Sequence, residues 1–111
     1  MNTLIDPEIQ NLAEILNEKK AEALCVIDLK RDPSMTDFIL IATALNAPHL
    51  DALCSALRKK VKKKFYLTGE SHSGWMIMDY GDWIIHMMSP EQRDYYKLES
   101  IWSRQADIYY I

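Results

Sequence analysis

The chain has 111 residues, of which 49% are hydrophobic and 26% are charged, as is typical of one globular domain rather than two. Its formal net charge of −3 excludes a general attraction to nucleic acid or to anionic lipid, although a local basic cluster can still act. The sequence shows neither a signal peptide nor an apolar run of the roughly 18 residues that would span a bilayer. We therefore expect a single soluble, cytoplasmic domain over residues 1–111, with no membrane contact.

Three N-capping residues mark the starts of predicted helices: Asp6, Asn46 and Ser89. Each is followed by a proline within the first turn, where a backbone N–H is not needed. Apolar residues at three- and four-residue steps predict that the first helix runs to about Lys20 and that the second ends in the basic run 58–64. The third helix begins like a capping box, with Gln92 reaching back to the N-cap. It is expected to carry four further residues on neighbouring turns: Tyr95, Leu98, Glu99 and Trp102.

Short β-prone runs alternate with these helices. They predict strands at 23–29, 37–43, 65–67, 75–80 and 83–88. Gly81-Asp82 is a turn signal of the Gly-X type, so the last two strands should form a hairpin. The apolar tail "ADIYYI" is expected either to form a last strand or to pack against a partner. The interleaved order predicts an α/β fold with a mixed sheet of about five strands and flanking helices.

The two-residue turn fixes the pairing within the hairpin and therefore which side chains share a face. One face is apolar apart from a tyrosine hydroxyl and should lie against helices: Met76, Met78, Tyr80, Trp83, Ile85 and Met87. The other face is largely apolar but carries an acid and a histidine: Trp75, Ile77, Asp79, Ile84, His86 and Met88. A solvated sheet face is normally more polar than this. The second face is therefore either covered by more of the chain or open to a partner.

The ionisable residues do not form a recognisable catalytic or metal site. Asp79 and Asp82 straddle the turn and have no third acid nearby, so a turn aspartate and a strand-end acid are favoured over a metal-binding pair. Asp79 and His86 are diagonal neighbours, which favours a structural hydrogen bond because no nearby serine has the setting of a nucleophile. Cys25 and Cys54 lie in apolar segments without zinc-ligand spacing, so two buried free thiols are expected. No glycine-rich phosphate loop is present, and no cofactor is expected.

The run 58–64 supplies six of the thirteen lysine and arginine residues. Basic residues stabilise a helix C-terminus, so a solvated helix end is one interpretation. Six charges in seven residues exceed what capping needs, so contact with RNA phosphates is the other interpretation. The residues proposed for that contact are Arg58, Lys59, Lys62 and Lys63.

The segment "GWMIMDYGDWIIHMMSPEQRDYYKLESIW" closely resembles the signature of the ribosomal silencing factor family, also called the Iojap-related family. The matching residues are Trp75, Asp79, Gly81, Asp82, His86, Glu91, Arg93, Tyr96, Leu98, Glu99 and Trp102. The resemblance extends from about Ile9 to Trp102. The chain departs from the family pattern at "ALNAP", where the family usually has Gly-x-Ser after the second strand.

The resemblance implies a small α/β fold similar to nucleotidyltransferases, without their catalytic acids and without known enzymatic activity. It implies binding to the large ribosomal subunit through ribosomal protein fourteen, which blocks joining of the small subunit and lowers translation when nutrients are short. Many members of the family are homodimers, and the sheet face and hairpin form the contact surface.

On this chain the expected partner-binding residues are Trp75, Asp79, Tyr80, Asp82, Tyr96, Glu99 and Trp102. The aromatic residues are the types that dominate binding hot spots, and the acids would pair with basic groups of the partner. The basic run would touch ribosomal RNA. A nucleotidyltransferase-like enzyme and a general RNA-binding module remain the alternatives.

Overall fold

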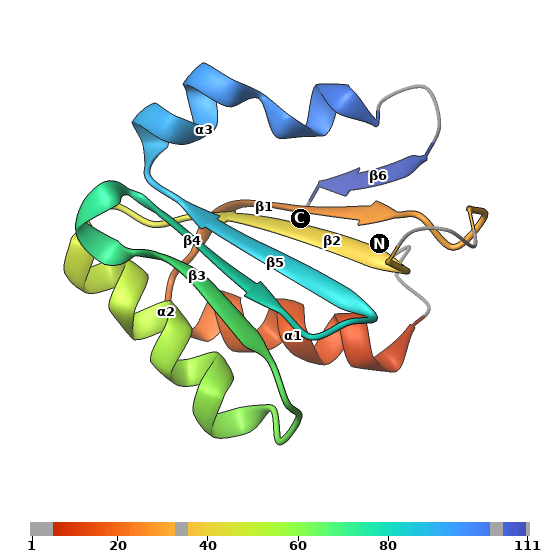
Figure 1. Ribbon diagram of the computed structural model, residues 1–111, viewed down its shortest axis with the longest axis horizontal. Coiled ribbons are helices and arrows are strands. Elements are labelled where there is room, and N and C mark those ends of the chain that lie inside the picture. Colours follow the sequence, from red (N-terminus) through yellow and green to blue (C-terminus); the bar gives the residue numbers. More distant parts are fainter. Residues whose placement is uncertain (1–5, 33–35, 103–105, 111) are drawn as a thin grey trace.

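The fold is built on one mixed β-sheet with helices on both faces (Figure 1). The computed structural model describes residues 6–32, 36–102 and 106–110. The helices are α1 (Pro7–Glu18), α2 (Ala47–Lys60) and α3 (Pro90–Tyr96), with short 3₁₀ segments η1 (Ser71–Ser73) and η2 (Leu98–Ile101). The strands are β1 (Glu22–Asp28), β2 (Phe38–Thr43), β3 (Tyr66–Glu70), β4 (Trp75–Asp79), β5 (Trp83–Met88) and β6 (Asp107–Tyr110).

The predicted α/β class is confirmed, but the sheet has six strands rather than about five. The additional strand is β6, so the tail forms a last strand, and Val26 of β1 lies opposite Tyr109. Ile111, also part of that tail, lies outside the described residues. The third strand spans 66–70 rather than 65–67, because part of the turn-rich segment after Leu67 pairs with β4.

The strand order is β3-β4-β5-β2-β1-β6. Strands β2 and β5 run parallel, and every other pair of neighbours runs antiparallel. Parallel neighbours require a crossover connection, and the chain between β2 and β5 crosses over through α2. As a result the hairpin of β4 and β5 is joined to the middle of the sheet, and β3 forms one edge of it.

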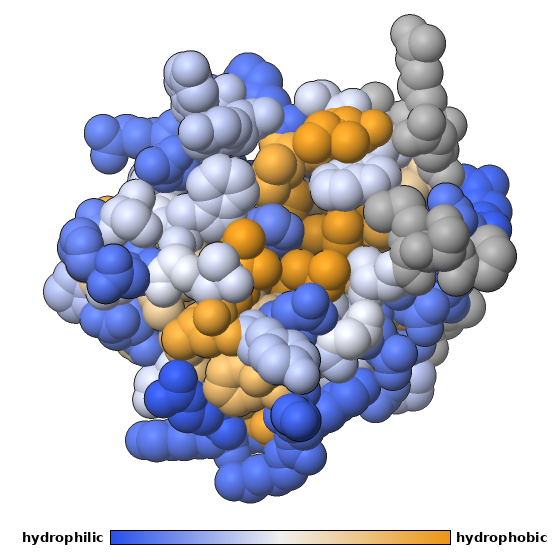
Figure 2. Space-filling view, viewed as in Figure 1, coloured by the Kyte–Doolittle hydropathy of each residue, from blue (hydrophilic) through white to orange (hydrophobic). Residues whose placement is uncertain are grey.

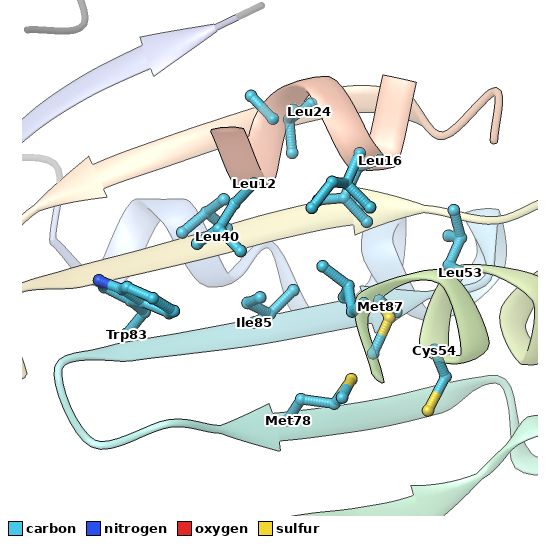
Figure 3. Packing of buried hydrophobic residues seen from close by; sticks show 14 of the residues in the cluster. Leu12, Leu16, Leu24, Leu40, Leu53, Cys54, Met78, Trp83, Ile85 and Met87 are labelled. Atoms are coloured by element: carbon cyan, nitrogen blue, oxygen red, sulfur yellow. The ribbon is translucent and has the colours of Figure 1, made fainter. Parts of the chain in front are cut away.

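The main core lies between the sheet and the layer formed by α1 and α2 (Figure 3). Leu12 and Leu16 of α1 and Leu53 of α2 point toward side chains of the strands, among them Leu40 and Ile85. The hairpin face predicted to lie against helices does so, with every side chain at most 5% exposed: Met76, Met78, Tyr80, Trp83, Ile85 and Met87. The two thiols are buried and free, as expected: Cys25 and Cys54.

The hairpin has the predicted register. Trp75 lies opposite Met88 and Ile77 lies opposite His86, while the backbone N–H of Tyr80 donates to the carbonyl oxygen of Trp83 at 2.8 Å. Gly81 has a φ of +93°, a value that glycine adopts without strain. The two-residue turn therefore determines which hairpin side chains enter the core.

The helix starts are confirmed, whereas one helix end differs from the prediction. The side chains of Asp6, Asn46 and Ser89 each accept a backbone N–H of the first turn. The reciprocal half of the capping box is absent, because the Gln92 amide donates to the carbonyl oxygen of Ser73 at 3.2 Å instead. The first helix ends at Glu18, close to the expected Lys20.

The third helix does not continue through Trp102. It ends at Tyr96, because Lys97 adopts a left-handed conformation with a φ of +46° that an α-helix cannot accommodate. The chain then turns into η2 and crosses the second face of the sheet. Its side chains complete a smaller core with β1 and β2, which contains Cys25, Ile27, Leu29, Ile39, Ile41, Met88, Leu98, Trp102, Ala106 and Ile108.

Two glycines with similar backbone angles differ in their surroundings and allow a matched test of β3 packing. Gly69 has a φ of +89°, and a Cβ atom there would lie 2.2 Å from the carbonyl oxygen of Trp75. Gly81 has a φ of +93° and nothing within 4 Å of such an atom. We expect Gly81→Ala to lower the free energy of unfolding by about 1 kcal/mol through left-handed strain alone. Gly69→Ala should cost about 1–3 kcal/mol more, because the backbone of β3 must move away from β4.

Urea unfolding of the two variants measures this difference. Equal losses of unfolding free energy would show that β3 does not approach β4 as closely as the structure indicates.

Candidate functional site

The second face of the sheet is covered over one half and accessible over the other. Side chains of η2, Trp102 and Ala106 pack over β1 and β2, whereas the part formed by β4 and the adjacent side of β5 is only partly buried. Its half-buried residues are Trp75, Ile77, Asp79, Ile84 and His86, which we call the uncovered face. Figure 2 shows hydrophobic residues gathered in the middle of this side of the molecule, with hydrophilic residues around them. The expectation that more of the chain covers this face is therefore confirmed over one half, and the other half stays the predicted partner surface.

Trp75, His86 and Tyr96 form an aromatic group at one end of the uncovered face. The indole N–H of Trp75 donates to Nδ1 of His86 at 3.1 Å. The Trp75 ring lies 4.9 Å from the ring of Tyr96, which belongs to α3 and is 49% exposed. Tyr95 packs edge-on against Tyr96 and extends the group into solvent. An exposed tyrosine supported by a fixed tryptophan provides a rigid apolar contact with a polar tip.

His86 is neutral at pH 7. Burial lowers the pKa of its imidazole from 6.5 to about 4. Since Nδ1 accepts the hydrogen bond from Trp75, the neutral ring carries its proton on Nε2. His86 therefore holds the Trp75 ring in place and brings no charge to the uncovered face.

Asp79 supplies the acid of the uncovered face. Its Oδ1 accepts the backbone N–H of Gly81 at 2.8 Å, which stabilises the hairpin turn. The expected hydrogen bond between Asp79 and His86 is not formed, because His86 is bonded to Trp75 and Asp79 to the turn. The second carboxylate oxygen leaves Asp79 able to meet a basic group.

Strand β3 extends the uncovered face beyond what the sequence indicated. Directly opposed residues share a face, and the register places Tyr66 opposite Asp79, Thr68 opposite Ile77 and Glu70 opposite Trp75. All three β3 residues are exposed. The strand predicted here, 65–67, is too short for its faces to be assigned, because "TGESHSG" has the composition of a loop.

Arg93 holds the chain that follows α3 against the second face of the sheet. Its Nη1 donates to the carbonyl oxygen of Ala23 at 2.6 Å and to Oγ1 of Thr43 at 2.9 Å, and its Nη2 donates to Oε2 of Glu99 at 3.1 Å. The carbonyl of Ala23 is available because the pairing of β1 with β2 is irregular there, with a φ of +49° at Ala23. The side chains of Arg93 and Glu99 are only 12% and 21% exposed.

The structure therefore separates the seven residues expected to bind a partner. Trp75, Asp79 and Tyr96 lie together on the uncovered face. Glu99 is paired with Arg93 inside the molecule, and Trp102 packs partly buried over the covered half.

Tyr80 and Asp82 lie elsewhere in the hairpin. Tyr80 is 5% exposed and packs in the main core against Phe65 and Trp83, with ring centroids 5.4 Å away in both cases. Burial raises the pKa of its hydroxyl to about 12. Asp82 is exposed at the turn and pairs with Nζ of Lys63 at 3.1 Å.

Apart from Lys64, the basic run lies on the helix side of the sheet, away from the uncovered face. Two of its cations are paired, since Lys60 meets Glu18 at 2.6 Å and Lys63 meets Asp82. Arg58 and Lys64 lie over the rings of Phe65 and Tyr66. Lys59 and Lys62 are exposed and have no ion pair among the described residues.

The part of the chain that the structure describes contains no group of three or more His, Cys, Asp or Glu side chains that could hold a metal ion. None of the helices in residues 6–32, 36–102 and 106–110 is long and apolar enough to cross a membrane.

Comparisons with known proteins identify relatives that match most of the chain. Residues 3–110 match the family model described as "Ribosomal silencing factor during starvation". The chain is 30% identical over 103 residues to the ribosomal silencing factor RsfS of Chromobacterium violaceum, over 88% of this chain and 84% of that protein. A crystal structure of a protein from Chromobacterium violaceum has a TM-score of 0.76 and 29% sequence identity, over 88% of this chain and 86% of that chain.

An organellar relative is also similar. The chain is 30% identical over 106 residues to the Mus musculus protein named "Mitochondrial assembly of ribosomal large subunit protein 1", over 89% of this chain. It spans about half of that relative, 46% of its length.

The buried His86 predicts a dependence of stability on pH. Because its pKa is lower in the folded chain than the ordinary 6.5, the unfolded chain binds the additional proton first. The free energy of unfolding should therefore be unaffected by His86 above pH 6.5 and fall as the pH decreases from 6.5 toward 4. His86→Gln keeps an acceptor for Trp75 without titrating. Between pH 7 and pH 4 the unmodified chain should lose about 3 kcal/mol more than this variant in urea unfolding. Parallel pH profiles of the two proteins would contradict this account of His86.

The Arg93–Glu99 pair can be tested by a double-mutant cycle. Arg93→Met leaves the half-buried Glu99 carboxylate unpaired and should lower the free energy of unfolding by about 3 kcal/mol. The further change Glu99→Leu should recover a large part of this loss, because the uncompensated charge is removed. If the two single losses simply add in the double variant, the pair does not hold the C-terminal segment in place.

Proposed function

Because the chain belongs to the ribosomal silencing factor family, whose members are not enzymes, we propose that it represses translation by binding the large ribosomal subunit. Acting as a single domain in the cytoplasm, it binds through ribosomal protein fourteen and sterically blocks joining of the small subunit. The nucleotidyltransferase-like arrangement and the homodimeric state implied by the family resemblance are part of the same proposal.

The observation that carries this proposal is the uncovered face. Trp75, Ile77 and Ile84 form a half-buried apolar strip, of which Trp75 and Ile84 also pack against the smaller core at the border of the covered half. Exposed apolar strips rimmed by polar residues are typical of sites that bind another macromolecule. The mixture of aromatic rings with few charges also resembles the centre of protein interfaces.

The charges of the uncovered face favour a basic protein partner. Asp79 and Glu70 lie at opposite ends of β4 and β3, and Tyr66 and Trp75 lie opposite them in the register. Acid and ring together suit a lysine or arginine side chain, through ion pairing and cation–π contact. Trp75 and Tyr96 are the proposed anchors, while Tyr80 and Glu99 support the surface from inside.

The two other residues of the expected set lie at its borders. Asp82 is exposed at the hairpin turn, and Trp102 borders the covered half. In the proposal they contact the rim of the partner, where contributions to affinity are small.

Contact with ribosomal RNA is a second part of the proposal. Lys59 and Lys62 are exposed cations of the run without an ion pair among the described residues, and Arg58 and Lys63 lie beside them. They lie on the helix side, opposite the uncovered face, so the proposed contact is with ribosomal RNA beyond the protein that the uncovered face binds. Phosphates neutralised there would add a salt-dependent term to binding.

A nucleotidyltransferase-like enzyme is not favoured by any feature of the described residues. No metal-binding group of acids exists among them. A general RNA-binding module is disfavoured by the apolar, acidic character of the uncovered face, because nucleic-acid surfaces are basic.

Co-sedimentation with purified large subunits tests the proposal. Tyr96→Ala and Ile77→Arg change accessible groups of the uncovered face, and each should weaken binding about tenfold or more. Ser55→Arg, an exposed position on α2, is the matched control and should bind normally. Addition of small subunits should then yield fewer joined ribosomes only with the unmodified chain and the control. Normal binding by both face variants would contradict the choice of this surface.

A reduction seen only with Lys59→Ala/Lys62→Ala would instead favour RNA as the main contact. Such a loss should shrink as the salt concentration rises, because the phosphate contacts that the variant lacks are the salt-dependent part of binding.

A further inference from the structure

A pocket of about 730 Å³ lies beside α3, between this helix, the start of β1 and strand β6. Tyr96 lies on another face of the same helix, where it contacts Trp75. The pocket is therefore separate from the uncovered face. Its volume falls in the range of roughly 300–1,000 Å³ that is usual for small-molecule sites. From α3 and the residue that ends it, the lining takes residues at three- and four-residue steps: Pro90, Arg93, Asp94 and Lys97.

The backbone at the pocket adopts conformations that are rare for residues other than glycine. Ala23 and Lys97 both line the pocket, and their φ angles are +49° and +46°. The pairing of β1 with β2 is irregular between Glu22 and Cys25, next to the pocket. Irregular strand pairing and left-handed residues are concentrated at binding sites and other functional sites. Their coincidence at one pocket favours a binding role over a mere gap in packing.

Two buried polar atoms of the pocket residues have no hydrogen-bond partner among the described residues: Nε of Arg93 and Oε1 of Glu99. The remaining polar atoms of the two side chains are paired, since Nη1 of Arg93 bonds to β1 and β2 and its Nη2 bonds to Oε2 of Glu99. Buried polar groups are nearly always hydrogen-bonded, so each exception needs an explanation. Here one ion pair offers a cationic donor and an anionic acceptor, both without a partner.

Strand β6 supplies an apolar wall for the pocket. Ile108 lies opposite Ile27 and Tyr110 lies opposite Cys25, so both side chains of β6 are on the second face of the sheet. Both line the pocket, and Tyr110 is 69% exposed. An exposed aromatic ring provides a large apolar contact area for a ligand.

From these features we propose that the pocket binds a free amino acid with an apolar side chain. The carboxylate of the ligand accepts the Nε–H of Arg93, its ammonium group donates to Oε1 of Glu99, and its side chain packs on Tyr110. A carboxylate and an ammonium group on one carbon atom match the adjacent cation and anion, and hydrogen bonds between charged groups are the strong ones. Both protein atoms are shielded from solvent in the free chain. Binding therefore needs a small rotation of Glu99, whose side chain is 21% exposed.

The charges of the lining favour a zwitterion over other small ligands. Two bases, Arg93 and Lys97, balance two acids, Asp94 and Glu99. A dianion would be repelled by the acids and a dication by the bases, whereas a zwitterion meets neither repulsion.

Isothermal titration calorimetry of the chain alone with L-phenylalanine tests the inference. No ribosome is needed, so the result is independent of the proposed function. We expect a Kd below about 1 mM. Phenylalaninamide lacks the carboxylate and N-acetylphenylalanine lacks the ammonium group, so each should bind about tenfold more weakly or worse. L-Glutamate, with a second carboxylate, should bind as weakly as these two compounds.

A second measurement uses the link between the pocket and the fold. Arg93 and Glu99 also hold the chain that follows α3 against the sheet. A ligand that binds both side chains binds only the folded chain, so the midpoint of urea unfolding should rise as L-phenylalanine is added.

Variants locate the site. Tyr110→Ala removes an exposed part of the apolar wall and should raise the Kd for L-phenylalanine about fivefold or more. Tyr95→Ala is the matched control, because Tyr95 is 79% exposed and packs against Tyr96 instead. Glu99→Gln keeps an acceptor oxygen without the charge and should reduce the affinity for L-phenylalanine to that for N-acetylphenylalanine. Circular dichroism would establish that all three variants are folded.

Three outcomes would overturn the inference. L-Phenylalanine could fail to bind the unmodified chain at concentrations up to about 10 mM. The amide and the N-acetyl compound could bind as tightly as L-phenylalanine, which would show that the ion pair does not recognise the two charges. Tyr110→Ala could bind like Tyr95→Ala, which would place the site elsewhere on the chain.

Discussion

The arrangement of the proposed functional surface depends on the hydrogen bonds that the Arg93 guanidinium donates. The guanidinium joins α3 to the irregular start of β1, to Thr43 of β2 and to Glu99 of η2. Together with the helix end at Lys97, it sets the C-terminal segment across β1 and β2. One sheet face is thereby divided, so that half of it is core and half is accessible surface. A helix continuing straight past Lys97 could not divide the face in this way.

The chain has two surfaces of opposite character on opposite sides of one sheet. The helix side carries the basic run, in which Lys60 and Lys63 are already paired. The uncovered face is apolar and acidic, with the neutral His86 holding Trp75 in position. The small net charge of −3 is therefore the sum of a basic helix side and an acidic uncovered face. Such an asymmetry orients a small protein on a larger partner before any specific contact is made.

Features that depend on residues close together in the sequence were predicted correctly. Features that depend on contacts between distant residues were not. The Gly81-Asp82 turn fixed the hairpin register, and three N-caps located the helix starts, because both are local interactions. Lys97 is left-handed although no glycine marks the position, since the contacts of Arg93 with Ala23 and Thr43 outweigh the local preference. The same long-range contacts take Glu99 inside, and the pairing of β3 with β4 adds Tyr66 and Glu70 to the uncovered face. Aromatic and acidic residue types alone do not distinguish Tyr80 in the core from Tyr96 on the surface.

The central claim is that the uncovered face contacts the large ribosomal subunit. Hydroxyl-radical footprinting of the chain, free and bound to purified large subunits, measures the accessibility of individual side chains in the intact complex. The account predicts that Trp75, Ile77 and Tyr96 become protected on binding, while exposed side chains in the middle of α2, such as Asp51, react as in the free chain. Protection confined to the helix side, with the reactivity of Trp75 and Tyr96 unchanged, would contradict it.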